Sequence, residues 1–222
     1  MPTQQAQIMN QLIRGNAGET VPGIAKATEI RQLYKTGLQQ IRGDRHMHPD
    51  RKRVELATLY TSAKETLAKV RMEQTERDAK TFDELDRKVW GYALERATAT
   101  DRATLDTTIR DARDRAAKLK TAEHAGRALR DAELAGDHIL ARAIGKQAHD
   151  HDWNDVLYDY FENRPSAAAA YQQAGEIWHR TQTAGGRVHE GMQYVVPKPE
   201  ELRGLNDQDI NGMTGDPNGA AA

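Results

Sequence analysis

Apolar residues recur at three- and four-residue steps over two neighbouring stretches in the first third of the chain. The first stretch contains Ile30, Tyr34, Leu38 and Ile41, and the second contains Leu56, Tyr60, Ala63, Leu67 and Val70. This spacing places each set along one stripe of an α-helix, and alternation between three and four is typical of a coiled-coil seam. A short polar connection at 43–48, with Pro49 at the start of the second helix, predicts a helical hairpin.

The same spacing returns between Asp101 and Ala135. Its apolar positions are Leu105, Ile109, Ala112, Ala116 and Leu119. Acids and bases four residues apart cover the remaining positions, as on a solvated helix face. We therefore expect residues 23–135 to form a long helical hairpin or coiled-coil region. The packing positions that we expect to serve seams within or between chains are Leu56, Tyr60, Leu67, Leu105, Ile109 and Leu119.

Shorter apolar segments follow, and they predict a compact helical subdomain over residues 136–183. Beyond it, Gly185-Gly186 predicts a helix end, and Pro197 with Pro199 opposes a regular helix. We expect an extended Gly- and Pro-containing tail over residues 184–222. In that tail, the alternating run at Tyr194, Val195 and Val196 suits addition of a strand to the sheet edge of a partner.

Residues 1–22 are rich in Gln and then Gly, with one apolar cluster at 8–13. This segment is either a flexible arm or a docking peptide whose apolar face meets a partner. Taken together, the patterns predict an all-α protein. Its parts are an elongated helical hairpin or coiled-coil region, a compact helical subdomain and a flexible C-terminal tail.

Composition and charge narrow the class of protein. Of 222 residues, 38% are hydrophobic and 29% are charged, which favours narrow seams over one deep core. The net charge of −1 gives no basic surface for phosphates, so we do not expect nucleic acid as a partner. The chain has no cysteine, which excludes disulfides and suits a reducing compartment. We expect no membrane span and no secretory signal, because no apolar run is long enough and the first residues are polar.

Two segments contain residues that can bind metals. His149-Asp150-His151-Asp152 offers imidazoles and carboxylates, but neighbouring residues at a helix end point in different directions, so a polar corner is favoured. Asp207–Asn211 matches the first half of a calcium loop, but Asn218 stands where the bidentate Glu is required. We expect no metal, no cofactor and no catalytic residue, and therefore no enzyme.

Several segments resemble proteins of actinobacterial tailed phages. The first half of the resemblance lies in residues 34–42, 48–53 and 56–60, and the second in residues 135–143, 152–157 and 164–165. Such proteins are typically encoded among virion structural genes, near capsid and connector genes. The resemblance implies helix-packing motifs, and the family supplies no catalytic residue to carry over.

We therefore expect a non-enzymatic structural or assembly protein of a tailed-phage particle. It would belong to the head or head–tail region or act as a scaffold-like helper. Its expected partners are further copies of itself and capsid, portal or connector-type proteins, in the virion or in the host cytoplasm during assembly. The alternative is a cellular helical adaptor, and an enzyme or DNA-binding module ranks third.

Overall fold

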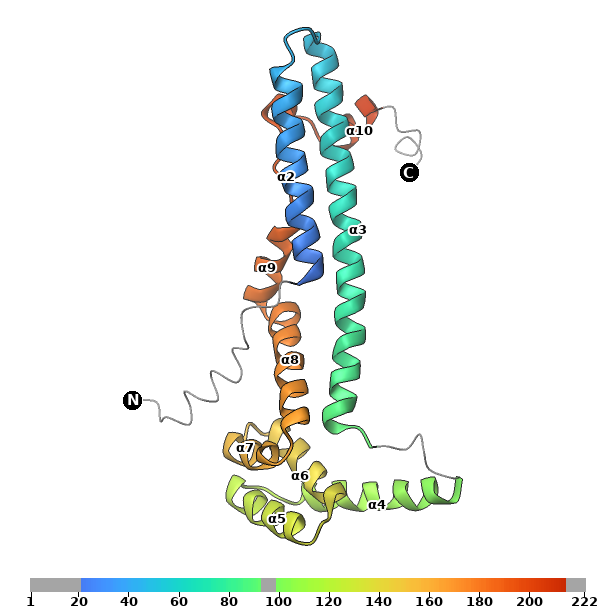
Figure 1. The fold of residues 1–222 in the computed structure, drawn as a ribbon, viewed down its shortest axis with the longest axis vertical. Coiled ribbons are helices and arrows are strands. Elements are labelled where there is room, and N and C mark those ends of the chain that lie inside the picture. The colour runs from blue at the N-terminus through green and yellow to red at the C-terminus, as the bar shows by residue number, and fades with distance from the viewer. Residues whose placement is uncertain (1–20, 93–98, 215–222) are drawn as a thin grey trace, which may run out of the picture. The chain divides into compact units, whose positions relative to one another are not determined.

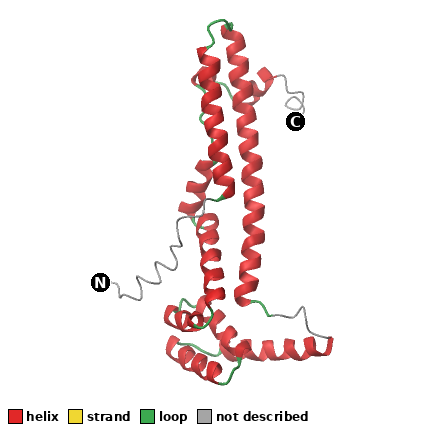
Figure 2. Cartoon of the chain, viewed as in Figure 1, coloured by secondary structure: helices red, strands yellow, loops and turns green. Residues whose placement is uncertain are grey.

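The computed structural model describes residues 21–92 and 99–214, and within these ranges the chain is helical without strands (Figures 1 and 2). The all-α prediction is confirmed. The predicted N-terminal arm lies almost wholly outside the described residues. The α-helices are α2 (Pro22–Gly43), α3 (Pro49–Trp90), α4 (Ala99–Ala117), α5 (Ala122–Leu134), α6 (His138–Asp150), α7 (Asn154–Glu162), α8 (Pro165–Gln182), α9 (Ala184–Gln193) and α10 (Asp207–Thr214), and Glu200–Leu202 form a short 3₁₀ helix.

The described residues divide into two compact units. One unit, called the core unit here, contains residues 80–177, and the other, the hairpin unit, contains residues 21–79 and 178–214. The boundaries fall inside α3 and α8, so each of these helices contributes residues to both units. This division differs from the predicted one, because α4 and α5 do not belong to the hairpin region. They share a hydrophobic core with α6 and α7.

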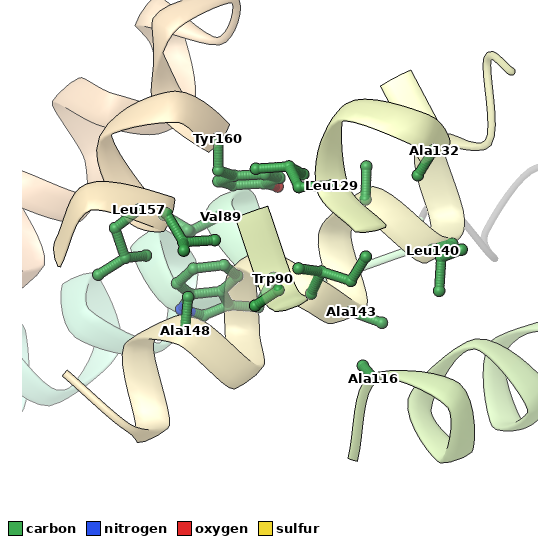
Figure 3. Packing of buried hydrophobic residues seen from close by; sticks show 14 of the residues in the cluster. Val89, Trp90, Ala116, Leu129, Ala132, Leu140, Ala143, Ala148, Leu157 and Tyr160 are labelled. Carbon is green, nitrogen blue, oxygen red and sulfur yellow. The ribbon is translucent and has the colours of Figure 1, made fainter. Parts of the chain in front are cut away.

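The core unit is built around α6. Small residues on this helix, Ala141 and Ala148, are completely buried and let the neighbouring helices approach closely. Tyr160 from α7 is also completely buried, and Figure 3 shows its ring beside Leu129. Trp90 joins the same cluster, and its ring stacks on that of Tyr160 with 5.8 Å between centroids. Aromatic side chains from α3 and α7 therefore form part of this core.

The predicted stripe of α4 faces this core. Ile109 is buried, Leu119 packs against the cluster and Leu105 is only half-buried. The N-terminal starts of α5 and α6 are fixed by side-chain caps. The hydroxyl of Thr121 accepts from the N–H of His124 at 3.3 Å, and the carboxylate of Asp137 accepts from the N–H of Leu140 at 2.9 Å. These caps satisfy N–H groups that a helix start leaves unpaired.

The hairpin unit contains α2 running beside the first part of α3 (Figure 1). Its predicted stripe is buried, since Tyr34, Leu67 and Val70 are each at most 3% exposed and belong to one cluster. Leu56 is also buried, whereas Tyr60 is half-buried. A helical hairpin is therefore confirmed, and coiled-coil geometry stays a prediction.

Candidate functional site

The last described stretch of the chain lies along the hairpin and is held there by polar contacts. We call residues 195–214 the strap. The hydroxyl of Tyr34 donates to the carbonyl oxygen of Pro197 at 2.7 Å. Arg42 donates to both carboxylate oxygens of Glu201, at 2.7 and 2.8 Å. Farther along, Lys64 Nζ lies 2.6 Å from Asp207 Oδ2. The strap thus contacts both helices of the hairpin.

Apolar side chains of the strap complete the core of the hairpin unit. Val196 packs in the same cluster as Tyr34 and Leu67. Leu202 and Ile210, at most 1% exposed, form a second cluster with Ala57 from α3. The prediction of an extended, flexible tail over 184–222 is therefore corrected for its described part, which contains α9 and α10 and buries apolar side chains. Local pattern could not reveal this packing, because the partners lie more than 100 residues away in the sequence.

The predicted docking run at 194–196 is split between the inside and the outside of the protein. Tyr194 is 6% exposed and Val196 is 5% exposed, and both pack in the protein's own hydrophobic cluster. Only Val195, at 61%, is exposed. Tyr194 and Val196 are thus not accessible to a partner in this structure, and their strand addition to another protein stays a prediction.

The start of the predicted tail is helical because the break between helices falls at Thr183, two residues before Gly185, and a new helix begins at Ala184. Thr183 separates α8 from α9, and its hydroxyl accepts from the N–H of Gly186 at 3.0 Å. The same hydroxyl donates to the carbonyl oxygen of His179 at 2.6 Å. A Cβ at position 186 would collide with the carbonyl oxygens of His179 and Arg180. Gly186 therefore permits a close approach of backbones inside a helical turn.

The calcium-like segment forms α10. The N–H of Asp209 donates to the side-chain oxygen of Asn206 at 2.8 Å, and the N–H of Asn206 donates to Asp209 Oδ2 at 3.1 Å. This reciprocal pair is a capping box, which the Asn-x-x-Asp spacing could have predicted. Asp207 contacts Lys64, and Ile210 is buried. The carboxylates that seemed suited to calcium thus have other partners.

A chain of buried polar groups joins α2, α3, α8 and α9 within the hairpin unit. The amide of Gln74 accepts from the N–H of Gly23 at 2.9 Å and donates to Asp78 Oδ1 at 2.8 Å. The guanidinium of Arg180 donates to the same oxygen at 2.6 Å, and its Nε lies 3.8 Å from Glu190 Oε1. Buried charges need such partners, because transfer out of water is costly. These residues were not predicted from the sequence.

Burial changes the protonation of groups around this network. It raises the pKa of Glu190 above its ordinary value, an effect that the nearby Arg180 opposes. Burial also raises the pKa of the Tyr194 hydroxyl, with Glu190 adding to the shift. In the hairpin core, burial raises the pKa of Tyr34 to about 12, so its hydroxyl stays a donor to Pro197.

Three large apolar side chains are exposed on α9 and directly after its end. Val188, Met192 and Val195 are 65%, 67% and 61% exposed, and they follow one another at steps of four and three residues. The first two lie on one face of α9, because residues four apart are neighbours on a helix. We call these three residues the α9 stripe. Isolated exposed apolar residues are ordinary on protein surfaces, but apolar residues gathered in one stripe are typical of interaction sites.

The polar corner between α6 and α7 belongs to the core unit. His149 Nδ1 lies 2.9 Å from the hydroxyl of Tyr171, and its ring stacks on Trp90. His151 instead stacks on Trp153. Over residues 21–92 and 99–214, no three His, Asp or Glu side chains are grouped to hold a metal ion.

Comparison of the sequence with family models and curated proteins, and of the fold with solved structures, gives no significant match. Among the helices that the structure describes, none combines the length and apolar character needed to cross a bilayer. The function must therefore be argued from the surfaces of the hairpin unit and from the resemblance given above.

Proposed function

We propose that this protein is a structural or assembly protein of a tailed-phage particle, acting through helix packing rather than through chemistry. The observation that carries the proposal is the α9 stripe. Two large apolar side chains on α9 and a third just after it are exposed, and the segment that follows α9 is anchored to the hairpin by the buried residues Tyr194 and Val196. An apolar stripe that is held firmly in place suits docking on another protein, because it loses little conformational freedom on binding. The sequence resemblance supports capsid, portal or connector-type proteins as the partners.

Binding to capsid subunits tests the proposal. We expect capsid subunits to capture the intact protein, and a variant with Val188→Asp and Met192→Asp to be captured at least ten-fold less, because charge at the stripe opposes its desolvation. Leu134→Asp is the matched control. Leu134 is 88% exposed but lies on α5 in the core unit, so its substitution leaves capture unchanged.

Mass spectrometry of purified particles gives an independent test. Peptides of this protein in mature particles would support a virion component, and their presence only in assembly intermediates would support a scaffold-like helper. Absence from both, together with no capture by capsid subunits, would contradict the proposal. Capture of the stripe variant as strongly as the intact protein would contradict the assignment of the stripe.

A further inference from the structure

We propose that the α9 stripe docks on an acidic amphipathic helix of another protein, in which apolar side chains are flanked by Asp and Glu. Positively charged side chains lie on both sides of the stripe, and they come from α9, α2 and α3. This proposal rests on the proposed function, because it specifies the chemistry of the partner surface that the same stripe binds.

The first flank of the stripe carries two guanidiniums. Arg187 and Gly191 each lie one position before an α9 residue of the stripe, so they line the same side of it. Arg187 is exposed, and its guanidinium donates to the carbonyl oxygen of Gln182 at 3.1 Å. Gly191 has no side chain, and Arg71 of α3 reaches the space beside it. An Nη atom of Arg71 lies 3.9 Å from the point where a Cβ of Gly191 would stand.

The opposite flank carries a guanidinium and an imidazole. His189 and Gln193 each follow an α9 residue of the stripe by one position, so they line this side. His189 is exposed, and the side-chain oxygen of Gln193 accepts from the guanidinium of Arg31 on α2 at 3.1 Å. Arg31 also donates to the hydroxyl of Thr28. Both acceptors are uncharged, so neither neutralises the guanidinium.

No carboxylate of α9 offsets these charges at the surface. Glu190 is the one acid between Thr183 and Pro199 in the sequence. It lies on the face of α9 opposite the stripe, where it is largely buried beside Arg180. Arg71 acts on Glu190 only as a more distant charge. Within residues 21–92 and 99–214, none of the three guanidiniums around the stripe forms an ion pair. We call these three guanidiniums and His189 the cationic rim.

An apolar stripe with a cationic rim selects a partner of the complementary pattern. Interfaces have an apolar centre and a polar rim, and charges at the rim are met by opposite charges on the partner. The occupant must therefore bring apolar side chains to Val188 and Met192 and carboxylates to both flanks. A helix does so when apolar residues recur at steps of three and four with Asp or Glu beside them. A second copy of α9 does not fit, because symmetric pairing brings the two cationic rims together.

Selection from a library of displayed helical peptides tests the proposal with the full, unaltered chain as bait. Peptides that also bind the stripe variant, with Val188→Asp and Met192→Asp, are removed, so that only ligands of the stripe remain. We expect these peptides to combine apolar residues at steps of three and four with flanking Asp and Glu. Their binding should weaken as the salt concentration rises, because salt screens exposed charges. Selected peptides without an excess of acidic over basic residues, or no peptide that depends on the stripe, would overturn the proposal.

Reversal of one charge in the cationic rim isolates its contribution. Arg187→Glu should weaken binding of the selected acidic peptides by about three-fold, and Arg187→Gln should have a smaller effect in the same direction. Lys120→Glu is the matched control and should leave binding unchanged. Lys120 is also exposed and also donates to the last residue of a helix, Ala117 of α4, but it lies in the core unit. Equal binding by Arg187→Glu and the native protein would contradict the proposal.

Other occupants of the stripe are distinguished with the same stripe variant. Vesicles of anionic phospholipid and a double-stranded oligonucleotide also offer negative charge to the cationic rim. We expect neither to bind in a way that depends on Val188 and Met192. Binding of either one that the stripe variant loses would overturn the assignment to a protein helix. A dimer of the native protein that the stripe variant loses would overturn it as well.

The outcome can be separated from that of the proposed function. Capture by capsid subunits that needs the stripe, but that neither salt nor Arg187→Glu weakens, would contradict the acidic helix and leave the proposed function standing. Selection of acidic peptides that depend on the stripe, without any capture by capsid subunits, would contradict the proposed function and support the acidic helix.

Discussion

At the scale of single residues, the hairpin unit depends on a carboxylate that is almost completely buried. The side chain of Asp78 is 8% exposed, and its Oδ1 accepts from both Gln74 and Arg180. Arg180 is also largely buried, at 20%. Removing one member of such a pair leaves the other charge without compensation, which costs more than the pair contributes when intact. This asymmetry makes Asp78 a sensitive position.

We predict that Asp78→Ala lowers the free energy of unfolding by about 3 kcal/mol, because the largely buried guanidinium of Arg180 loses its close carboxylate partner and keeps only the longer contact with Glu190. Denaturant unfolding monitored by circular dichroism measures this change. Glu201→Ala is the control, since it removes a similar carboxylate from Arg42 at an exposed rim, and its cost should stay within about 1 kcal/mol. Equal costs for the two variants would show that burial of Asp78 is unimportant.

A second residue of the same network, Glu190, should make the folding stability of the protein depend on pH. Burial raises the pKa of Glu190 above its ordinary value of 4.5, and the charged groups around it are Arg180, Asp78 and Arg71. The folded chain therefore binds this proton more tightly than the unfolded chain does. The resulting stabilisation is fully present below the unfolded pKa and is lost as the pH rises through the folded pKa.

Glu190→Gln keeps the side chain neutral at every pH, so this variant should melt at a higher temperature than the native protein at neutral pH. The difference between the two melting temperatures should shrink as the pH falls below 4.5, where the native carboxyl is neutral as well. Thermal melts across this range provide the measurement. Glu65→Gln, at an exposed position of α3, should show no such convergence. A constant difference for Glu190→Gln would refute the assignment.

At the scale of elements, local periodicity predicted the helices that pack through regular stripes. Tyr34 and Leu67 were placed correctly, because three- and four-residue steps directly determine which face of a helix is apolar. The same reasoning did not reveal the burial of Tyr194 and Val196. Their alternation suggested a strand, but both are buried because α9 and the strap pack on a distant part of the chain. No spacing within residues 192–196 could encode that partner.

Contacts between helices also determine whether a position requires glycine or can accept a larger residue. Gly145 on α6 faces the ring of Tyr160, and a Cβ there would lie 2.8 to 3.0 Å from three ring carbons. Tyr160 is completely buried and stacks on Trp90, so the ring has little room to move. By contrast, a Cβ at Gly175 on α8 would meet nothing within 4 Å. Glycine is therefore needed at the first position and not at the second.

We predict opposite effects for the same substitution at these two positions. Gly145→Ala should lower the free energy of unfolding by about 1–3 kcal/mol, because overpacking against Tyr160 outweighs the better helix propensity of alanine. Gly175→Ala should raise it by up to about 1 kcal/mol, since propensity acts there alone. Denaturant unfolding of both variants provides the comparison. Stabilisation by Gly145→Ala would mean that α6 and α7 do not pack this closely.

At the scale of the whole molecule, the assignment of helices to units was beyond the reach of sequence pattern. The stripe at Ile109, Ala112 and Ala116 resembles that of the hairpin, so the sequence suggested one region from 23 to 135. In the structure, Ala112 and Ala116 belong to the cluster of the core unit. A stripe specifies that a helix packs on one face, but it does not specify which helix covers that face. In the structure, the helix that covers this face of α4 is α6, which presents small residues there.

The two units also differ in their need for the C-terminal segment, and this leads to a prediction for a chain that ends at Thr183. Truncation removes Glu190, Tyr194, Val196, Leu202 and Ile210, which all belong to the hairpin unit and pack or pair within it. The buried residues of the core unit lie between Leu85 and Ala174, so none of them is lost.

Hydrogen exchange should therefore show much weaker protection of α2 and of residues 49–79 in the truncated chain, because their packing surface is exposed to water. Protection of α5, α6 and α7 should stay close to that of the full chain. A full-length variant with Leu202→Asp is the matched control, and it should reproduce the loss in the hairpin unit by placing a charge where Ala57 and Ile210 meet. Equal loss of protection in both units would mean that they fold as one. Unchanged protection of the hairpin would mean that α2 and α3 are stable without the strap, and that the strap contributes nothing to this unit.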